Sequence, residues 1–406
     1  MSIIVQKYGG SSVSDIGKLS KVAEIIATLK RTGKDVAVVV SAMGKTTDSL
    51  IKMAKGISAD PPKREIDMLL STGERISMSL LCIALNKLGI NAISLTGSQS
   101  GIITNDKHNN ARVIEVRPFR VLDELENGKV VVIGGFQGVS YKRDITTLGR
   151  GGSDTTAVAL AAALNAERCE IYSDVEGIYT ADPSIVKDAK HLPEISYEQM
   201  QEMSEAGAKV LNAQAVQFAK DANIAIYARS TFQPGKETII RKLPAGAPKG
   251  VKAVVHENNI IEVSLNDCED KKGFSWLLNY LDNEQIRIKE LKTFDFDRQG
   301  SQISFLIAKK DIINWEKIEK DVSEKFKDNV HLKVNLGAVS LIGDGVNKDN
   351  IILNETTRIL REERILVKGI TTTSFRISIL VSSEDVTKTT QICHHRWIEQ
   401  EYNLQN

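Results

Sequence analysis

Short apolar segments with strand character alternate with helix-like segments throughout the part of the chain before Lys242. The apolar segments are Ile3–Gln6, Val36–Val40, Val130–Ile133, Glu170–Tyr172 and Ile224–Tyr227. Strands that are apolar along most of their length are typical of parallel sheets, which helices cover on both faces. We therefore predict an α/β fold with a mostly parallel sheet sandwiched by helices. Ligands of such sheets bind at the carboxyl ends of the strands, so a site is expected in the loops there.

A segment rich in proline and glycine, Lys242–Gly250, divides the chain. Such a segment suits a solvated linker between domains. The full chain of 406 residues is also too long for one hydrophobic core of ordinary size. We predict a first domain over residues 1–244, a linker over residues 245–255 and a C-terminal part from residue 256.

The C-terminal part carries a faint internal repeat. Val263–Leu265 recurs as Val339–Leu341, and Ile303–Leu306 recurs as Ile377–Leu380. Each copy is expected to form strand, helix, strand, strand and helix, an order that fits a ferredoxin-like βαββαβ unit. We predict two such units, over residues 256–330 and 331–406.

Composition excludes several classes of protein. Lys plus Arg total 53 and Asp plus Glu total 52, so the net charge is +1 and nucleic acid is not an expected partner. The longest apolar runs are far below the roughly 18 residues that a membrane span needs. The first residues lack the pattern of a signal peptide. We therefore expect a cytoplasmic protein that does not cross a membrane.

Neither the cysteines nor the histidines predict a metal site. The four cysteines lack the paired spacing of zinc or redox sites: Cys82, Cys169, Cys268 and Cys393. His394 and His395 are adjacent, so they do not face one metal from a helix, and His108 stands alone. We assign these side chains no function.

Two glycine motifs each precede a predicted helix. In Lys7–Ser12, glycines allow close approach of a ligand, and Lys7 adds a charge to the free amides of the helix start. This segment is either a phosphate cradle or a tight turn, because it has neither Walker nor Rossmann spacing. In Gly149–Thr156, Arg150 can bind a carboxylate and Asp154 can orient a lysine, or Ser153 or Asp154 is only an N-cap. Here we favour a function, because glycines on both sides of an arginine are a costly way to begin a helix.

Three further segments have weaker signals. Ser71 and Glu74 have the spacing of a capping box, which is the favoured interpretation on spacing alone. The hydroxyl groups of Ser41–Thr47 could hold a small polar substrate or cap the next helix. The segment Tyr172–Pro183 offers rings for a nucleobase and carboxylates for ribose or Mg²⁺, and is otherwise a loop.

Together and in this order, these segments resemble the aspartate kinases (aspartokinases) of the amino acid kinase family. The motifs are Lys7–Ser12, Ser41–Gly44, Gly73–Arg75, Gly135–Gly138, Gly149–Asp154 and Tyr172–Asp174. The tail more weakly resembles the paired ACT domains of that family, which bind amino acids and mediate dimerisation. The resemblance therefore covers both parts of the chain.

The resemblance implies the amino acid kinase fold followed by two ACT units. It also implies a phosphoryl-transfer reaction. The γ-phosphoryl group of ATP would pass to the side-chain carboxylate of L-aspartate, giving 4-phospho-L-aspartate and ADP. This is the first step from aspartate toward lysine, threonine, methionine and diaminopimelate. ATP would be the co-substrate, with Mg²⁺ held chiefly by its phosphates. A homodimer or higher homo-oligomer would form through the ACT units.

The resemblance also implies residue roles. Lys7 and Lys209 would bracket the transferring phosphoryl group, and Asp154 would orient Lys7. Arg150 would hold the α-carboxylate of aspartate, Glu74 its ammonium, and Ser41 and Thr47 its reacting end. The aspartate-binding set would be Ser41, Thr47, Glu74, Arg150, Gly151, Gly152 and Ser153. The nucleotide-binding set would be Lys7, Gly9, Gly10, Ser11, Ser173, Asp174, Tyr179, Asp182 and Lys209.

The tail departs from the family pattern at Asp270–Gly273, Thr293–Phe294 and Thr372–Phe375. Phe375 offers no partner for an ammonium, so we expect weak feedback by lysine or threonine, or a different effector. Two alternative functions stay open. One is another amino acid kinase, such as glutamate 5-kinase or uridylate kinase, and the other is a catalytically silent amino-acid sensor on the same fold. The presence of Lys7, Glu74, Arg150 and Asp154 argues against the sensor.

Overall fold

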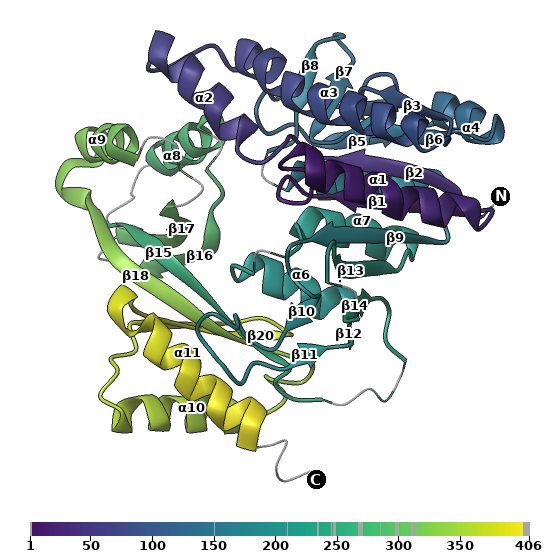
Figure 1. Ribbon diagram of the computed structural model, residues 1–406. Coiled ribbons are helices and arrows are strands. Elements are labelled where there is room, and N and C mark those ends of the chain that lie inside the picture. Colours follow the sequence, from purple (N-terminus) through teal and green to yellow (C-terminus); the bar gives the residue numbers. More distant parts are fainter. Residues whose placement is uncertain are drawn as a thin grey trace. The chain divides into compact units, whose positions relative to one another are not determined.

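The computed structural model describes residues 2–149, 151–208, 210–233, 235–244, 246, 249–266, 271–284, 286–296, 300–309, 312 and 315–400 (Figure 1). The chain divides into two compact units. The first comprises the described residues of Met1–Tyr179, His191–Glu205 and Lys209–Ala247. The second comprises those of Thr180–Lys190, Ala206–Ala208 and Pro248–Asn406.

The first unit is built on an eight-stranded sheet with the order β12-β14-β13-β9-β1-β2-β6-β3. Neighbouring strands are parallel except β13 and β14. The sheet confirms the predicted α/β class, and each predicted apolar segment forms or overlaps one of its strands. The strands are β1 (Ile3–Tyr8), β2 (Asp35–Val40), β3 (Ala92–Leu95), β6 (Val130–Gly134), β9 (Arg168–Ser173), β12 (Glu194–Ile195), β13 (Ile226–Ser230) and β14 (Glu237–Ile240).

Helices cover both faces of this sheet. Helix α1 begins where Asp15 accepts a hydrogen bond from the backbone N–H of Lys18, 2.8 Å away, as an N-cap does. Its apolar side chains and those of α3 pack on one face of β1, β2 and β6, while α5 packs against β1, β2 and β9. The helices are α1 (Ile16–Arg31), α2 (Thr46–Ile57), α3 (Lys63–Lys87), α4 (Phe119–Glu126), α5 (Gly152–Ala163), α6 (Tyr197–Glu205) and α7 (Ala213–Ala222).

Two smaller strand groups complete the first unit. One is a four-stranded sheet with the order β5-β4-β7-β8, and the other is the hairpin of β10 and β11. Their strands are β4 (Ile102–Thr104), β5 (Val113–Val116), β7 (Gln137–Ser140), β8 (Ile145–Thr147), β10 (Ile178–Tyr179) and β11 (His191–Leu192).

Helix α3 is long and apolar enough by composition to cross a membrane, which the sequence analysis did not anticipate. Half of its apolar stretch is buried inside the protein. The buried side chains include two carboxylates, Asp67 and Glu74. These are the surroundings of a core helix, which passes the same test of length and composition.

The second unit is a six-stranded antiparallel sheet with the order β16-β17-β15-β18-β20-β19. The repeated sequence segments lie in β15 and β18, and in β17 and β20. Its elements are β15 (Ala253–Leu265), α8 (Lys271–Asn283), β16 (Lys289–Phe296), β17 (Gly300–Ala308), α9 (Trp315–Phe326), β18 (Val330–Ile342), α10 (Ile351–Glu362), β19 (Gly369–Thr372), β20 (Arg376–Ser382) and α11 (Val386–His394).

Both copies of the repeat share the two long strands. The second half of β15, from Ile260, pairs with β17 on one side. The first half, Ala253–Glu257, pairs with β18 alone among the described strands. The stretch of β18 that it contacts, Ala338–Ile342, also pairs with β20. The second copy therefore takes its fourth strand from residues that precede the first copy. The structure also places Ala253–Val255, which the sequence analysis assigned to the linker, inside β15.

The segment Thr180–Lys190 is held within the second unit. The backbone N–H of Val254 donates to the carbonyl of Thr180, 2.7 Å away. The Thr180 hydroxyl lies 2.8 Å from Nε2 of His394, a side chain that is fully buried in α11. His394, which was given no function from the sequence, thus anchors this segment.

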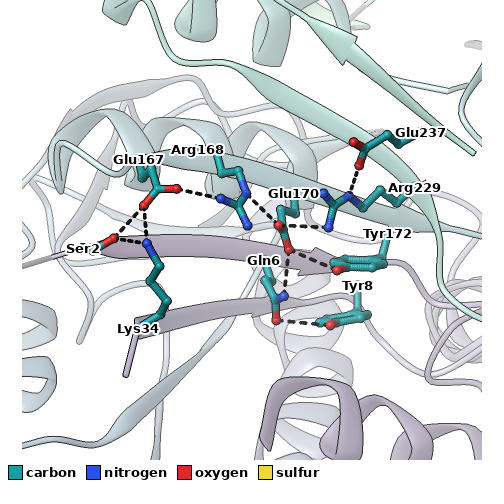
Figure 2. Close-up of polar contacts among 10 residues, drawn as sticks. All are labelled: Ser2, Gln6, Tyr8, Lys34, Glu167, Arg168, Glu170, Tyr172, Arg229 and Glu237. Carbon is teal, nitrogen blue, oxygen red and sulfur yellow. Dashed lines mark hydrogen bonds and ion pairs between the residues drawn. The ribbon is translucent and has the colours of Figure 1, made fainter. Parts of the chain in front are cut away.

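A buried carboxylate, Glu170, ties three strands of the first unit together (Figure 2). Its side chain is 1% exposed and accepts hydrogen bonds from Gln6 (2.8 Å) and Tyr172 (3.0 Å). The guanidinium groups of Arg168 and Arg229 lie 2.8 and 3.1 Å from its Oε1. A buried charge is stable only when it is paired and hydrogen-bonded in this way, so Glu170 joins β1, β9 and β13 at a fixed register.

We expect Glu170→Ala to lower the free energy of unfolding of the first unit by about 3 kcal/mol, because two guanidinium groups lose a buried partner. Urea denaturation measures this value. The control is Glu237→Ala, which removes a 39% exposed carboxylate that pairs with Arg229 and should cost less than about 1 kcal/mol. Equal losses of unfolding free energy in both variants would contradict the role of Glu170 as the carboxylate that joins the three strands.

Candidate active site

Lys7 and Asp154 form an ion pair at the carboxyl end of the central strand. Lys7 Nζ lies 2.7 Å from Asp154 Oδ1, and the two side chains are only 11% and 10% exposed. Lys7 belongs to β1 and Asp154 to the first turn of α5. The structure thus brings together two residues that lie almost 150 positions apart in sequence, at the edge where ligands of parallel sheets bind.

The loop after β1 stays close to its neighbours because it is built from glycine. A Cβ atom added to Gly10 would lie 2.8 Å from the carbonyl oxygen of Ala42, so a larger residue would push the two loops apart. A Cβ on Gly9 would lie 3.6 Å from Lys7 Nζ. The next residue, Ser11, is exposed to solvent. This geometry leaves backbone open beside a positive charge, as an anion site needs.

A second cluster of polar groups lies directly after the carboxyl end of β2. The Ser41 hydroxyl donates to the Ser153 hydroxyl, 3.0 Å away, and the Ser77 hydroxyl donates to the Ser41 carbonyl at 2.7 Å. The backbone N–H of Ala42 donates to Oε1 of Glu74 at 3.2 Å. Residues from β2, α3 and α5 thus converge, and Ser41, Glu74 and Ser153 of the predicted aspartate set are among them.

Glu74 is a buried carboxylate with an unused acceptor. Its side chain is 2% exposed, and Oε2 has no hydrogen-bond partner within the described part of the chain. Burial raises the pKa of Glu74 to about 7. Such a group is poised to meet a cation, since a positive charge would restore the ionised form.

The capping-box interpretation of Ser71 and Glu74 is wrong. Helix α3 begins at Lys63, so both residues lie in its interior. The Ser71 hydroxyl donates to the carbonyl of Met68, 2.9 Å away, instead of capping a helix start. Spacing alone did not distinguish a helix start from a helix interior.

The turn before α5 requires its glycines. Gly149 and Gly151 have φ values of 75° and 70°, in the left-handed region that favours glycine. Added Cβ atoms would lie 2.9 Å from Asn110 Oδ1 and 2.8 Å from Asn212 Nδ2, respectively. Gly151 is the N-cap of α5, so Ser153 and Asp154 are not, and the N-cap alternative for those residues is wrong.

The first turn of α5 begins at Gly152. A Cβ added to Gly152 would lie 2.8 Å from Leu148 Cβ, so close packing also selects glycine here. Here the backbone N–H groups of Gly152 and Asp154 already donate to the carbonyls of Gly149 and Gly151, both at 3.1 Å. Two predicted residues, Arg150 and Lys209, lie outside the described residues.

Three other predicted nucleotide residues, Ser173, Asp174 and Tyr179, lie at the end of β9 and in the chain that follows it. Ser173 ends β9, and its hydroxyl accepts from the backbone N–H of Val175 at 3.2 Å, while Asp174 is exposed. The ring of Tyr179 lies edge-on to His191 with centroids 5.6 Å apart, and Lys236 Nζ lies 5.8 Å from the Tyr179 centroid.

Two further predicted residues lie in other segments of the chain. Asp182 belongs to the second unit, where its carboxylate accepts from the backbone N–H and the hydroxyl of Ser184 at 2.9 and 2.6 Å. Thr47 lies half-buried in the first turn of α2, and no hydrogen bond links it to Ser41 or Glu74 in the part of the chain that the structure describes. Their roles stay predictions.

Comparison with known proteins places the chain in a family. The pattern of the amino acid kinase family matches residues 2–230. An aspartokinase of Mycolicibacterium smegmatis is 41% identical over 402 residues, which cover 97% of this chain and 96% of that protein. An aspartokinase of Corynebacterium glutamicum is 39% identical over 405 residues, with 98% and 96% covered. The chain belongs to the aspartokinases of the amino acid kinase family.

Solved structures agree with this membership. E. coli aspartokinase III, determined in complex with aspartate and ADP, superposes with a TM-score of 0.82 at 24% identity and covers 97% of this chain and 99% of that chain. An aspartate kinase from Synechocystis is 34% identical, with a TM-score of 0.55 over 97% of this chain and 69% of that chain. The predicted resemblance to aspartokinases and the predicted amino acid kinase fold are thus confirmed.

The raised pKa of Glu74 predicts a pH-dependent stability difference. The folded protein binds this proton more tightly than the unfolded chain, so the stability of the wild type falls as pH rises from 4.5 to about 7. Glu74→Gln mimics the neutral form. We expect it to match the wild type near pH 5 and to be more stable by about 2 to 3 kcal/mol near pH 8.

Urea denaturation of both proteins at the two pH values tests this expectation. The control is Glu65→Gln, which neutralises an exposed carboxylate of the same helix. The difference in unfolding free energy between this variant and the wild type should be the same at both pH values. A Glu74→Gln variant that is equally stable relative to the wild type at both pH values would show that Glu74 is ionised without penalty.

Proposed function

We propose that this aspartokinase transfers the γ-phosphoryl group of ATP to the side-chain carboxylate of L-aspartate, giving 4-phospho-L-aspartate and ADP. The observation that carries the proposal is the buried Oε2 of Glu74, which has no hydrogen-bond partner in the described residues and lies in one cluster with Ser41 and Ser153. An amino-acid ammonium is the natural partner for such an oxygen. The names of the relatives support the same substrate.

The reaction asks the protein mainly to position two anions and to neutralise developing charge. Lys7 is suited to the transferring phosphoryl group, because it is nearly buried beside the open glycine loop. Asp154 holds the Lys7 ammonium in place from α5. The hydroxyls of Ser41 and Ser153, 3.0 Å apart, would receive the substrate carboxylates.

The remaining role assignments rest on the family resemblance. Lys209 would act with Lys7 on the phosphoryl group, Arg150 would bind the α-carboxylate, and Thr47 the reacting end. Ser173, Asp174, Tyr179 and Asp182 would face the nucleotide. Exposed Asp174 and the half-buried ring of Tyr179 fit contacts with ribose and base.

We also propose that Mg²⁺ arrives with ATP. No group of three or more His, Cys, Asp or Glu side chains able to hold a metal occurs among the described residues, and Mg²⁺ usually keeps its waters and binds substrate phosphates. Bound in this way, Mg²⁺ would neutralise charge on the phosphates. The protein is further proposed to act in the cytoplasm as a homodimer or higher homo-oligomer through ACT units at residues 256–330 and 331–406.

The decisive assay measures ADP release from Mg²⁺-ATP with L-aspartate or L-glutamate. We expect turnover only with L-aspartate, and Lys7→Ala should lower kcat by about a hundredfold or more, because the charge next to the transferring group is lost. The control is Lys34→Ala, which removes a partly exposed ion pair with Glu167 and should retain full activity. Turnover with L-glutamate would indicate a glutamate 5-kinase. No turnover with either amino acid would favour a catalytically silent amino-acid sensor.

Feedback through the second unit remains a separate proposal. In the segment Thr372–Phe375, the backbone N–H of Phe375 donates to the Thr373 hydroxyl at 3.2 Å, and its carbonyl accepts from Gly343. The first contact occupies a backbone N–H that an effector carboxylate could use. The departure at Asp270 lies outside the described residues. We expect calorimetry to show weak or no binding of lysine and threonine, and tight binding of either would overturn this proposal.

A further inference from the structure

One fully buried carboxylate, Asp67, has no place in the roles discussed so far. It lies in α3 and is 0% exposed. Burial raises its pKa, the direction expected when an ionised group loses water. A carboxylate in this position is costly unless several donors satisfy it. No sequence motif marks Asp67, although it lies seven residues, about two helical turns, before Glu74 on the same helix.

Asp67 accepts hydrogen bonds from two separate segments of the chain. One is the loop between β4 and β5, where the backbone N–H of Asn109 donates at 3.0 Å and His108 Nδ1 lies 2.7 Å from Oδ2. The other is β8, where the Thr147 hydroxyl donates to Oδ1 at 2.5 Å. A single buried side chain therefore joins α3 to both segments.

Both segments lead to the turn that begins α5. Thr147 ends β8 and lies two residues before Gly149. Its carbonyl accepts from the backbone N–H of Ala111 at 2.8 Å, which fixes the neighbouring loop a second time. The adjacent side chain, Asn110, lies so close that its Oδ1 would be 2.9 Å from a Cβ atom on Gly149. The position of Gly149 is thus set from two sides by groups that Asp67 holds.

Helix α3 therefore carries Glu74 and also, through Asp67, contacts the residues beside Gly149. Glu74 would bind the ammonium of aspartate, and Ser153 in the first turn of α5 would receive its α-carboxylate. In an α-amino acid these two groups are attached to the same carbon atom, so their protein partners must stay at a fixed separation. A misplacement of about 1 Å at such a contact is enough to weaken binding strongly.

We propose that Asp67 is a positioning residue that sets Gly149 and the start of α5 at Gly151 and Gly152 relative to Glu74 and thereby determines the affinity for the amino-acid substrate. The inference rests on the proposed function, because it concerns the same substrate. It assigns no contact between Asp67 and the substrate. Its action passes through Thr147 and the loop that carries His108 and Asn109.

The first test is Asp67→Asn, which keeps the shape but replaces one acceptor oxygen with a donor that would face other donors. We expect the KM for L-aspartate to rise about tenfold, as the loss of a hydrogen bond to a buried charge implies. The KM for ATP should change by less than about twofold, because Lys7 and Ser173 of the predicted nucleotide set lie in β1 and β9 and not at the start of α5. Asp106→Asn is the matched control, since it alters an exposed carboxylate of the same loop that pairs with Lys142.

The second test changes the opposite partner and avoids the risk that Asp67→Asn fails to fold. Thr147→Val removes the hydroxyl at nearly constant volume, and Thr147→Ser keeps it. We expect Thr147→Val to raise the KM for aspartate by about fivefold and Thr147→Ser to restore it to near the wild-type value. A purely structural anchor would not produce this rescue together with an unchanged KM for ATP.

The outcomes separate the inference from the proposed function. A wild type without aspartate-dependent turnover would refute the proposed function. An active wild type whose Asp67→Asn and Thr147→Val variants lose thermal stability but keep the KM for aspartate would overturn the positioning role. Equal increases in the KM for aspartate and for ATP would also overturn it, since they would indicate a general distortion of the site.

Discussion

The ion pair between Lys7 and Asp154 is the interaction on which the arrangement of the site depends. Both side chains are about nine-tenths buried, and neither charge would be tolerated there alone. Each is therefore a condition for burying the other, and together they join the end of β1 to the start of α5. The glycines around them permit this close approach, because a Cβ at Gly10 or Gly151 would meet atoms less than 3 Å away.

Glu74 contrasts with this pair, because its carboxylate has an oxygen without a counter-ion among the described residues. Lys7 has its counter-ion within the protein, whereas Oε2 of Glu74 has no partner among the described residues. The Lys7 ammonium is thus paired before a ligand binds, whereas the Glu74 carboxylate is available to a positively charged group of the ligand. Burying an unsatisfied carboxylate lowers stability, a cost that proteins accept where a ligand later supplies the missing charge.

Local sequence patterns predicted the strands and the glycine loops. They missed the features that depend on contacts between residues far apart in sequence. Apolar runs predicted the main strands of the first unit. Glycine motifs located the loops around Lys7 and Asp154. The capping-box pattern failed because Ser71 and Glu74 are in the middle of a longer helix. Asp67 was missed because its partners, His108, Asn109 and Thr147, come from segments far away in sequence.

Strand sharing in the second unit is the clearest case of a boundary that no local pattern reveals. The two copies look separable in sequence, yet β15 and β18 each run through both. A chain cut near residue 330 would leave β15 without its partner β18 and the second copy without its fourth strand. Unpaired backbone groups along so long an edge are unfavourable. The two copies therefore share the backbone of β15 and β18 and cannot be separated near residue 330 without leaving strand edges unpaired.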